Sequence, residues 1–119
     1  MEYNNLLDLA VKQSDPIRRL AYVAIYSTTL LTSLERNTTK PFNPLLGETY
    51  ELVTDDLMFI AEQVAHHPPI TAFECEGKSG YKLWSCNRAK TKFTGKSLNL
   101  TPCYKIYVEL LPHKELYEI

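Results

Sequence analysis

The sequence predicts an α+β fold, in which N-terminal helices are followed by an antiparallel β-meander, and two observations indicate it. Apolar residues recur at helical spacing as far as Arg36, and beyond it they occur in short runs separated by turn residues. The composition is that of an ordinary folded protein, because 45% of the 119 residues are hydrophobic and 23% are charged. A chain of this length forms at most one domain with a modest core.

Two helices are expected in residues 1–36, the helical lead-in. A short first helix has an apolar side formed by Leu6, Leu7, Leu9 and Ala10. A longer second helix is expected to begin at Pro16, because Asp15 is a suitable N-cap and proline is favoured in the first helical turn. The face that we expect to pack against the rest of the fold carries Ile17, Leu20, Ala21, Ala24, Thr28, Leu31 and Leu34.

Residues 47–119 are expected to form strands. The helical region ends before Pro41 and Pro44, because prolines remove amide donors and favour extended backbone before them. The expected strands are Thr49–Val53, Met58–Val64, Ile70–Cys75, Tyr81–Ala89, Thr91–Leu100 and Tyr104–Leu110. Short loops between successive strands are typical of an antiparallel meander. Because this meander would end on an open edge, we expect it to be part of a larger barrel or sheet.

Charge and cysteine content restrict the function only weakly. The formal net charge is -1, but residues 77–108 contain no acidic residue and carry Lys78, Lys82, Arg88, Lys90, Lys92, Lys96 and Lys105. This half of the chain either faces an anionic surface or forms solvated strand edges. Cys75, Cys86 and Cys103 have no close spacing, so neither a disulfide framework nor a zinc site is expected. The longest helical apolar run, Leu20 to Tyr26, is too short to span a bilayer.

The segment EQVAHHPP, residues 62–69, contains two of the 3 histidines. Successive strand residues point to opposite faces, so His66 and His67 can serve one ligand only if the backbone turns, and the two following prolines favour a turn. Such a pair would donate hydrogen bonds to a phosphate. Three alternatives stay open: a metal pair with Glu62 or His113, a pair of bases acting on Ser85, Ser97 or Cys75, and structural histidines bonded to the backbone.

A second motif is KPFNPLLGE, residues 40–48. Its stiff loop would present the Lys40 ammonium, the Asn43 amide and backbone N–H groups to a phosphate, and otherwise it is a rigid connector between helix and strand. The tripeptide at residues 95–97, GKS, resembles the end of a P-loop. Lys90 stands where the leading glycine would be, so nucleotide binding is not expected.

The two motifs, extended to KPFNPLLGETYEL and EQVAHHPPITAF, resemble the core of the oxysterol-binding protein family of cytosolic lipid-transfer proteins. The resemblance extends to the helical lead-in and to KTKFTGKSLNL and YKIYVELLPHKELYEI downstream. It implies a large, incompletely closed antiparallel barrel around a lipid tunnel, and exchange of a sterol or another lipid for phosphatidylinositol 4-phosphate. It also implies that Lys40, His66 and His67 hold the phosphorylated headgroup and that Asn43 supports them.

The resemblance therefore leads us to expect a partial lipid-binding domain in residues 1–119, without catalytic activity, cofactor, metal or nucleic-acid partner. Ala65 stands where the family usually has serine or cysteine. The expected partners are a lipid and anionic organelle membranes, contacted peripherally from the cytoplasm. Because the family's lid, later strands and C-terminal basic residues have no counterpart here, the alternative is a structural or interaction fragment that does not transfer lipid.

Overall fold

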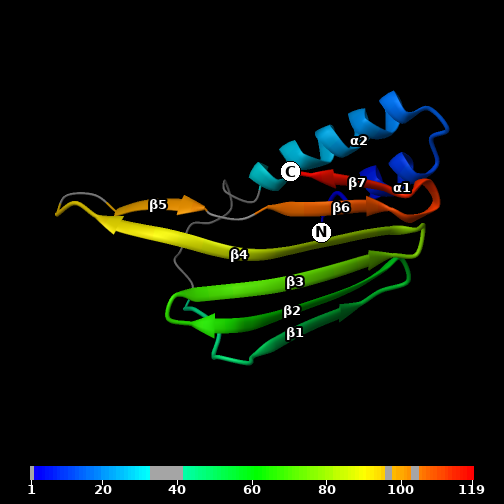
Figure 1. The fold of residues 1–119 in the computed structure, drawn as a ribbon. Helices are drawn as coiled ribbons and strands as arrows, with labels where there is room; N and C mark the ends of the chain where they lie inside the picture. The colour runs from blue at the N-terminus through cyan, green and yellow to red at the C-terminus, as the bar shows by residue number, and fades with distance from the viewer. Residues whose placement is uncertain (1, 33–41, 96–97, 103–104) are drawn as a thin grey trace.

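The computed structural model describes residues 2–32, 42–95, 98–102 and 105–119. Two helices, α1 (Asn5–Val11) and α2 (Pro16–Thr29), lie over part of a curved antiparallel sheet (Figure 1). The strands are β1 (Thr49–Val53), β2 (Leu57–His66), β3 (Pro69–Gly77), β4 (Tyr81–Phe93), β5 (Leu98–Pro102), β6 (Ile106–Leu110) and β7 (Glu115–Glu118). The helical start is as predicted, because the Asp15 carboxylate accepts a hydrogen bond of 3.0 Å from the Ile17 N–H.

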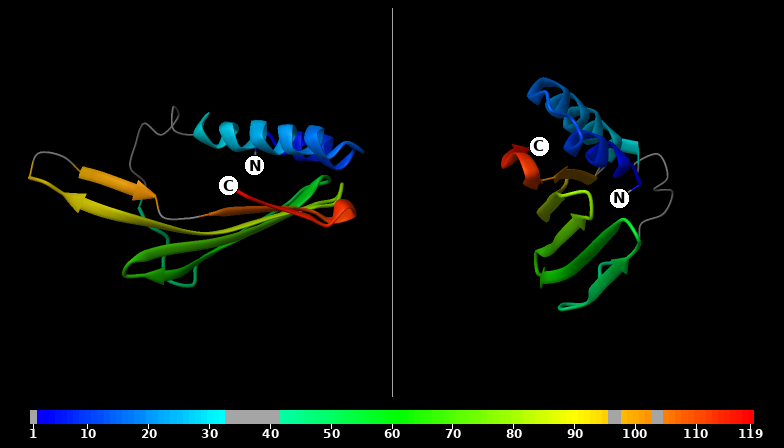
Figure 2. Two further views of the ribbon diagram at one scale, coloured as in Figure 1. Left: turned by 45° about the horizontal axis from the view of Figure 1, so that its top comes forward. Right: turned by 90° about the vertical axis from the view of Figure 1, so that its right-hand side faces the viewer.

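The strands run in the order β1-β2-β3-β4-β6-β7, and β5 pairs only with β4. The first part of β4, Tyr81 to Ser85, pairs with β6, whereas its last part, Ala89 to Phe93, pairs with β5. The β4–β5 hairpin therefore projects beyond the rest of the sheet, while β1 to β3 curve away from the helices (Figure 2). The sheet is antiparallel throughout, as expected, but it is not a simple meander.

Two strand predictions were wrong. The expected break between Tyr81–Ala89 and Thr91–Leu100 does not exist, because β4 continues to Phe93. The turn comes at Gly95, whose φ of 82° suits a glycine better than other residues. Strand β7 was not predicted; it follows a single 3₁₀ turn, η2 (Leu111–His113), and pairs with β6.

The core lies between the helices and the sheet face that they cover, which we call the inner face. Its buried side chains are Leu7, Ala10, Val23, Tyr26, Leu57, Cys75, Tyr81, Leu83, Ile106, Val108 and Leu110. On β4 and β6 these residues alternate with exposed or half-buried ones, as expected for strands with one covered face. Neither helix of the described chain has the length and apolar composition that crossing a bilayer requires.

The predicted packing face of α2 was wrong. On the predicted face, Ile17 is 74% exposed, Leu20 54% and, just after the helix, Leu31 65%, whereas the buried positions of α2 are Arg19, Val23 and Tyr26. Leu34 lies outside the described residues. The prediction failed because the packed face contains a charged residue, Arg19. The buried positions therefore do not form the apolar pattern at helical spacing on which the prediction was based.

Arg19 is buried with all three of its guanidinium nitrogens hydrogen-bonded. Its Nε and Nη2 donate to the two carboxylate oxygens of Glu115 at 2.7 and 2.6 Å, and Nη1 donates to the Gln13 and Ser14 carbonyls at 2.9 and 2.8 Å. The Tyr117 hydroxyl donates to the same carboxylate at 2.6 Å. Hydrogen bonding to Arg19 lowers the pKa of Glu115 to about 2. This cluster ties the α1–α2 connection to β7.

Candidate functional site

The two adjacent histidines lie at the turn between β2 and β3. His66 ends β2 opposite Pro69, the first residue of β3, and His67 and Pro68 form the turn, with a cis peptide bond between them. The imidazole centroids are 4.6 Å apart and the ring planes meet at 69°. The structure thus brings the two rings together, as the sequence predicted for a backbone that turns at this point.

A β-bulge sets the face on which His66 lies. Gln63 pairs with Thr71, but the next pair is Ala65 with Ile70, so Val64 is an extra residue in β2. Strict alternation from Leu57, Phe59, Ala61 and Gln63 would place residue 65, not 66, on the inner face. The bulge shifts this alternation by one residue and puts His66 on the inner face.

The buried side chain of Gln63 bridges this bulge. Its Nε2 donates to the Ala65 carbonyl at 2.9 Å, and its Oε1 accepts from the Thr71 hydroxyl at 2.5 Å. Gln63 is 1% exposed, so both hydrogen bonds are shielded from water. Gln63 was not among the predicted site residues. The sequence did carry a signal for it: residues 57, 59 and 61 are apolar and alternate along the strand, and the next residue on that face, Gln63, is polar.

Backbone hydrogen bonds dock the second motif onto the histidine strand. The Gly47 N–H donates to the Gln63 carbonyl at 2.9 Å, and the Gln63 N–H donates to the Glu48 carbonyl at 3.0 Å. A turn closes the loop, since the Leu45 N–H donates to a Glu48 carboxylate oxygen at 2.7 Å and Gly47 has a φ of 77°. The two motifs are therefore in contact at Gln63, which lies three residues before His66 in the sequence. Asn43 is exposed just before this turn, and Lys40 lies outside the described residues.

His66 has unused hydrogen-bonding capacity. Its Nδ1 is buried and has no hydrogen-bond partner among the described residues. Buried polar atoms are usually paired in folded proteins, so an unpaired one is a candidate contact for a ligand. His67 is exposed beside it. Two imidazoles with free ring nitrogens can donate to the oxygens of one anion.

The described residues give little support to the alternative roles of the histidines. They include no group of three or more His, Cys, Asp or Glu side chains suited to a metal ion. His113 lies in the β6–β7 turn, at the other end of the sheet (Figure 1), with Nε2 2.8 Å from the Val11 carbonyl oxygen. Burial raises the pKa of the Cys75 thiol to about 11, which disfavours the nucleophilic thiolate. The Ser85 Oγ lies 2.8 Å from the Lys105 carbonyl oxygen, and Ser97 is outside the described part.

An aromatic row lines the inner face of β1 to β3 beyond the helices. The Phe59 ring meets Tyr50 edge-on at 6.2 Å and stacks with Phe73 at 5.8 Å. Tyr50 is largely exposed, and Phe59 and Phe73 are partly buried against the core. An apolar surface therefore continues along the same face of the sheet that carries His66.

The whole chain matches one protein family. The sequence pattern of the family described as oxysterol-binding protein matches residues 1–119. Oxysterol-binding protein-related protein 1 of Mus musculus and of Homo sapiens is 48% identical over 120 residues, covering 98% of this chain and 13% of that protein. Oxysterol-binding protein-related protein 2 of Mus musculus is 46% identical, covering 98% of this chain and 25% of that protein. The chain thus spans a quarter or less of these relatives.

Solved structures show the same arrangement of elements. The Osh1 ORD domain in complex with ergosterol has a TM-score of 0.88 at 36% identity, covering 98% of this chain and 29% of that one. The Osh3 ORD from Saccharomyces cerevisiae in complex with PI(4)P has a TM-score of 0.78 at 34% identity, covering 98% of this chain and 32% of that one. These similarities confirm the prediction of helices followed by part of a larger lipid-binding barrel.

Proposed function

This chain belongs to the oxysterol-binding protein family, and from that premise we propose that it binds a membrane lipid and serves lipid transfer between membranes. We further propose that the β2–β3 turn binds the headgroup of phosphatidylinositol 4-phosphate. The observation that carries this proposal is the buried, unpaired Nδ1 of His66, held on the inner face by the bulge and adjacent to His67. The proposed role is binding and not catalysis.

Two further residues complete the proposed headgroup site. The loop that contains Asn43 is hydrogen-bonded through Gly47 and Glu48 to Gln63, close in sequence to the histidines. Lys40 precedes this loop by a few residues, so a lysine ammonium there would supply the positive charge that a phosphomonoester requires. We propose Lys40, Asn43, His66 and His67 as the four headgroup residues.

The apolar part of the lipid would lie along the inner face. The aromatic row of Tyr50, Phe59 and Phe73 offers an apolar wall on the same sheet face as His66. Similar domains have been crystallised with ergosterol, cholesterol and PI(4)P, so a sterol is the proposed second lipid. We propose residues 1–119 as one part of such a domain, with the helical lead-in before residue 37 and barrel strands from residue 47.

Peripheral contact with anionic membranes is also proposed, but two of its predicted lysines are already paired. Lys82 Nζ lies 2.7 Å from a Glu74 carboxylate oxygen, and Lys105 Nζ lies 2.6 Å from Glu118. Lys78 and Arg88 are exposed and remain suited to contact with a cytosolic leaflet. Binding to anionic vesicles should weaken strongly in moderate salt if this contact exists, and salt-independent binding would argue against it.

Headgroup binding is tested with vesicles that contain or lack phosphatidylinositol 4-phosphate. We expect specific binding by the 119-residue chain to fall at least tenfold in the double variant His66→Ala/His67→Ala and in Lys40→Ala, because charge-assisted hydrogen bonds contribute about 1.5–3 kcal/mol each. His113→Gln, which changes the histidine outside the site, should bind normally. Equal binding by all four proteins would contradict the proposed site.

Transfer needs a separate measurement, because binding does not establish it. The second candidate function is a lipid-binding or interaction role without transfer activity, which headgroup binding alone would not distinguish from transfer. Movement of labelled lipid between two vesicle populations separates the candidates. Histidine-dependent binding without movement would support the role without transfer, whereas histidine-dependent movement would support transfer by this chain.

A further inference from the structure

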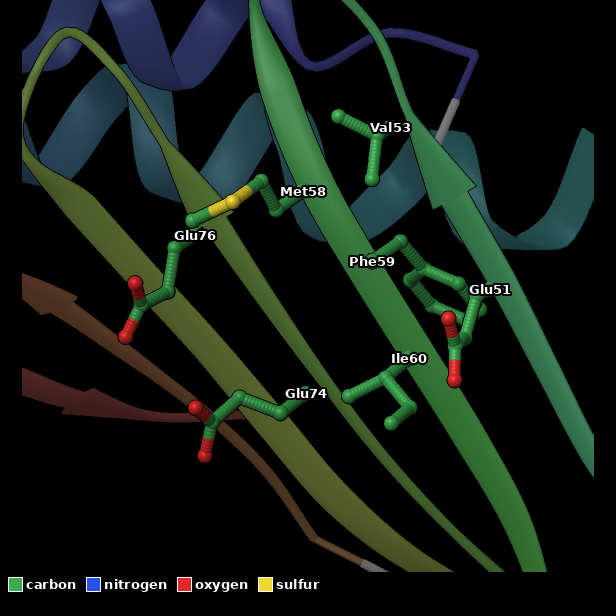
Figure 3. A pocket seen from close by; sticks show the side chains of 7 residues that line it. All are labelled: Glu51, Val53, Met58, Phe59, Ile60, Glu74 and Glu76. Atoms are coloured by element: carbon green, nitrogen blue, oxygen red, sulfur yellow. The ribbon is translucent and has the colours of Figure 1, made fainter.

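The sheet face opposite the helices, which we call the outer face, carries an ordered set of side chains. Strand register places one row across it, consisting of Glu51, Ile60, Glu74, Trp84 and Tyr107. The next row consists of Val53, Met58, Glu76, Lys82 and Glu109. The apolar residues of β2 thus lie between the Glu51 carboxylate on β1 and the Glu74 and Glu76 carboxylates on β3 (Figure 3).

A groove of about 330 Å³ follows this apolar strip, with Met58 and Ile60 as its floor. Both side chains are about half exposed, and Val53 at one end is exposed further. A second hollow of about 410 Å³ shares Ile60 and Glu74 with the first and extends to Trp84. A contiguous exposed apolar strip of this kind marks an interaction site more often than scattered apolar residues do.

The groove is bordered by uncompensated negative charge. Glu74 and Glu76 share one cation, Lys82, at 2.7 and 3.2 Å. Within the described part of the chain, Glu51 and Glu62 form no ion pair. An occupant that is apolar at its centre and basic on both sides would therefore complement this surface, and an acidic one would be repelled.

The distance between the carboxylate on β1 and those on β3 suits a helix. Glu51 on β1 and Glu74 on β3 are separated by one intervening strand, so their strands lie roughly 10 Å apart at the usual strand spacing. A helix with its side chains is about 10–12 Å wide. Lysine or arginine residues on the two flanks of one helix would therefore reach the carboxylates on both sides of the groove while its apolar ridge contacts Met58 and Ile60.

We propose that the outer groove is a docking site for an amphipathic helix whose apolar ridge is flanked on both sides by lysine or arginine. The site is independent of the headgroup site, because Ile60 and His66 lie on opposite faces of β2. Trp84 provides a direct readout, since it is the only tryptophan of the chain and lines the adjoining hollow.

The test is a fluorescence titration of the 119-residue chain with two tryptophan-free helical peptides of equal length. One has a leucine ridge flanked by lysines, and in the other glutamate replaces every lysine. We expect a saturable change in Trp84 emission with the lysine peptide alone, weakened by salt. Ile60→Lys should weaken binding at least tenfold, while Leu116→Lys, on the same face at β7, should leave it unchanged. Glu51→Gln should weaken it a few-fold, and Asp55→Asn in the β1–β2 turn should not.

Three outcomes would overturn the proposal. Equal binding of both peptides would show that the groove binds apolar helices whatever charge flanks their ridge. Unchanged binding in Ile60→Lys would place the contact elsewhere. Self-association of the chain that Ile60→Lys abolishes and that excludes the peptide would make a second copy the occupant. His66→Ala should leave peptide binding intact. Vesicle binding therefore tests the headgroup site and peptide binding tests the groove, and either proposal can fail without the other.

Discussion

Substitution of Gly77 by alanine tests how closely β3 and β4 pack. Gly77, the last residue of β3, lies directly opposite Tyr81, the first residue of β4. A Cβ on Gly77 would lie 2.1 Å from Cε1, 2.3 Å from Cζ and 2.6 Å from Cδ1 of the Tyr81 ring. The ring is 0% exposed, so it cannot swing into solvent to make room. An aromatic ring over a glycine is a recurrent cross-strand pairing.

Two effects of opposite sign set the magnitude. Alanine in place of glycine within a strand would by itself stabilise the chain by about 0.5–1 kcal/mol. Overpacking of a core costs about 1–3 kcal/mol, and the upper part of that range applies because 2.1 Å is far below an ordinary carbon–carbon contact. We expect Gly77→Ala to lower the free energy of unfolding by about 2 kcal/mol, and the midpoint temperature by roughly 6–10 °C.

Urea unfolding followed by circular dichroism measures this loss. Gly47→Ala is the matched control, because no heavy atom lies within 4 Å of its Cβ and only its positive φ opposes alanine. In a Tyr81→Leu background the ring is absent, so Gly77→Ala should cost much less than in the original chain. An equal cost in both backgrounds would refute the steric explanation.

Three further predictions concern other parts of the fold. The pKa of Glu115 is about 2 in the folded chain against an ordinary 4.5, so its ion pair with Arg19 stabilises the fold fully above pH 4.5, and this stabilisation is lost as the pH falls toward 2. The free energy of unfolding should therefore fall less steeply with decreasing pH in Glu115→Gln, as acid titration would show. Iodoacetamide at pH 8 should modify exposed Cys86 and spare buried Cys75, whose pKa is about 11, as peptide mass mapping would show. Gln63→Ala should lower the free energy of unfolding by about 1–3 kcal/mol in urea titrations and weaken vesicle binding, because it leaves the Ala65 carbonyl unpaired.

Features decided by neighbouring residues were predictable from the sequence. Asp15 and Pro16 start α2 as expected. The prolines after His67 lie at a turn, also as expected, and the two imidazole rings are in contact there. The site residues themselves remain predictions, because Lys40 lies outside the described residues and Asn43 is exposed. The side chains of His66 and His67 meet, but their ligand is a proposal.

Features decided by distant residues were not predictable. The buried face of α2 depends on the pairing of Arg19 with Glu115, which is 96 positions away and lies on a strand that the turn signals did not reveal. The bulge at Val64 depends on the hydrogen bonds of Gln63 across to Thr71. Local propensity carries no information on either partner.

The two ends of β4 pair with different strands, and this implies that their local stability differs. From Tyr81 to Ser85 its backbone is paired on both sides, by β3 and β6, over the buried core. From Ala89 to Phe93, beyond the end of β3, the one strand of the described chain that pairs with it is β5. Local opening of the β4–β5 hairpin therefore breaks few long-range contacts and can occur without global unfolding. We therefore expect the backbone amides of the β4–β5 hairpin to exchange with solvent sooner than those of the central sheet.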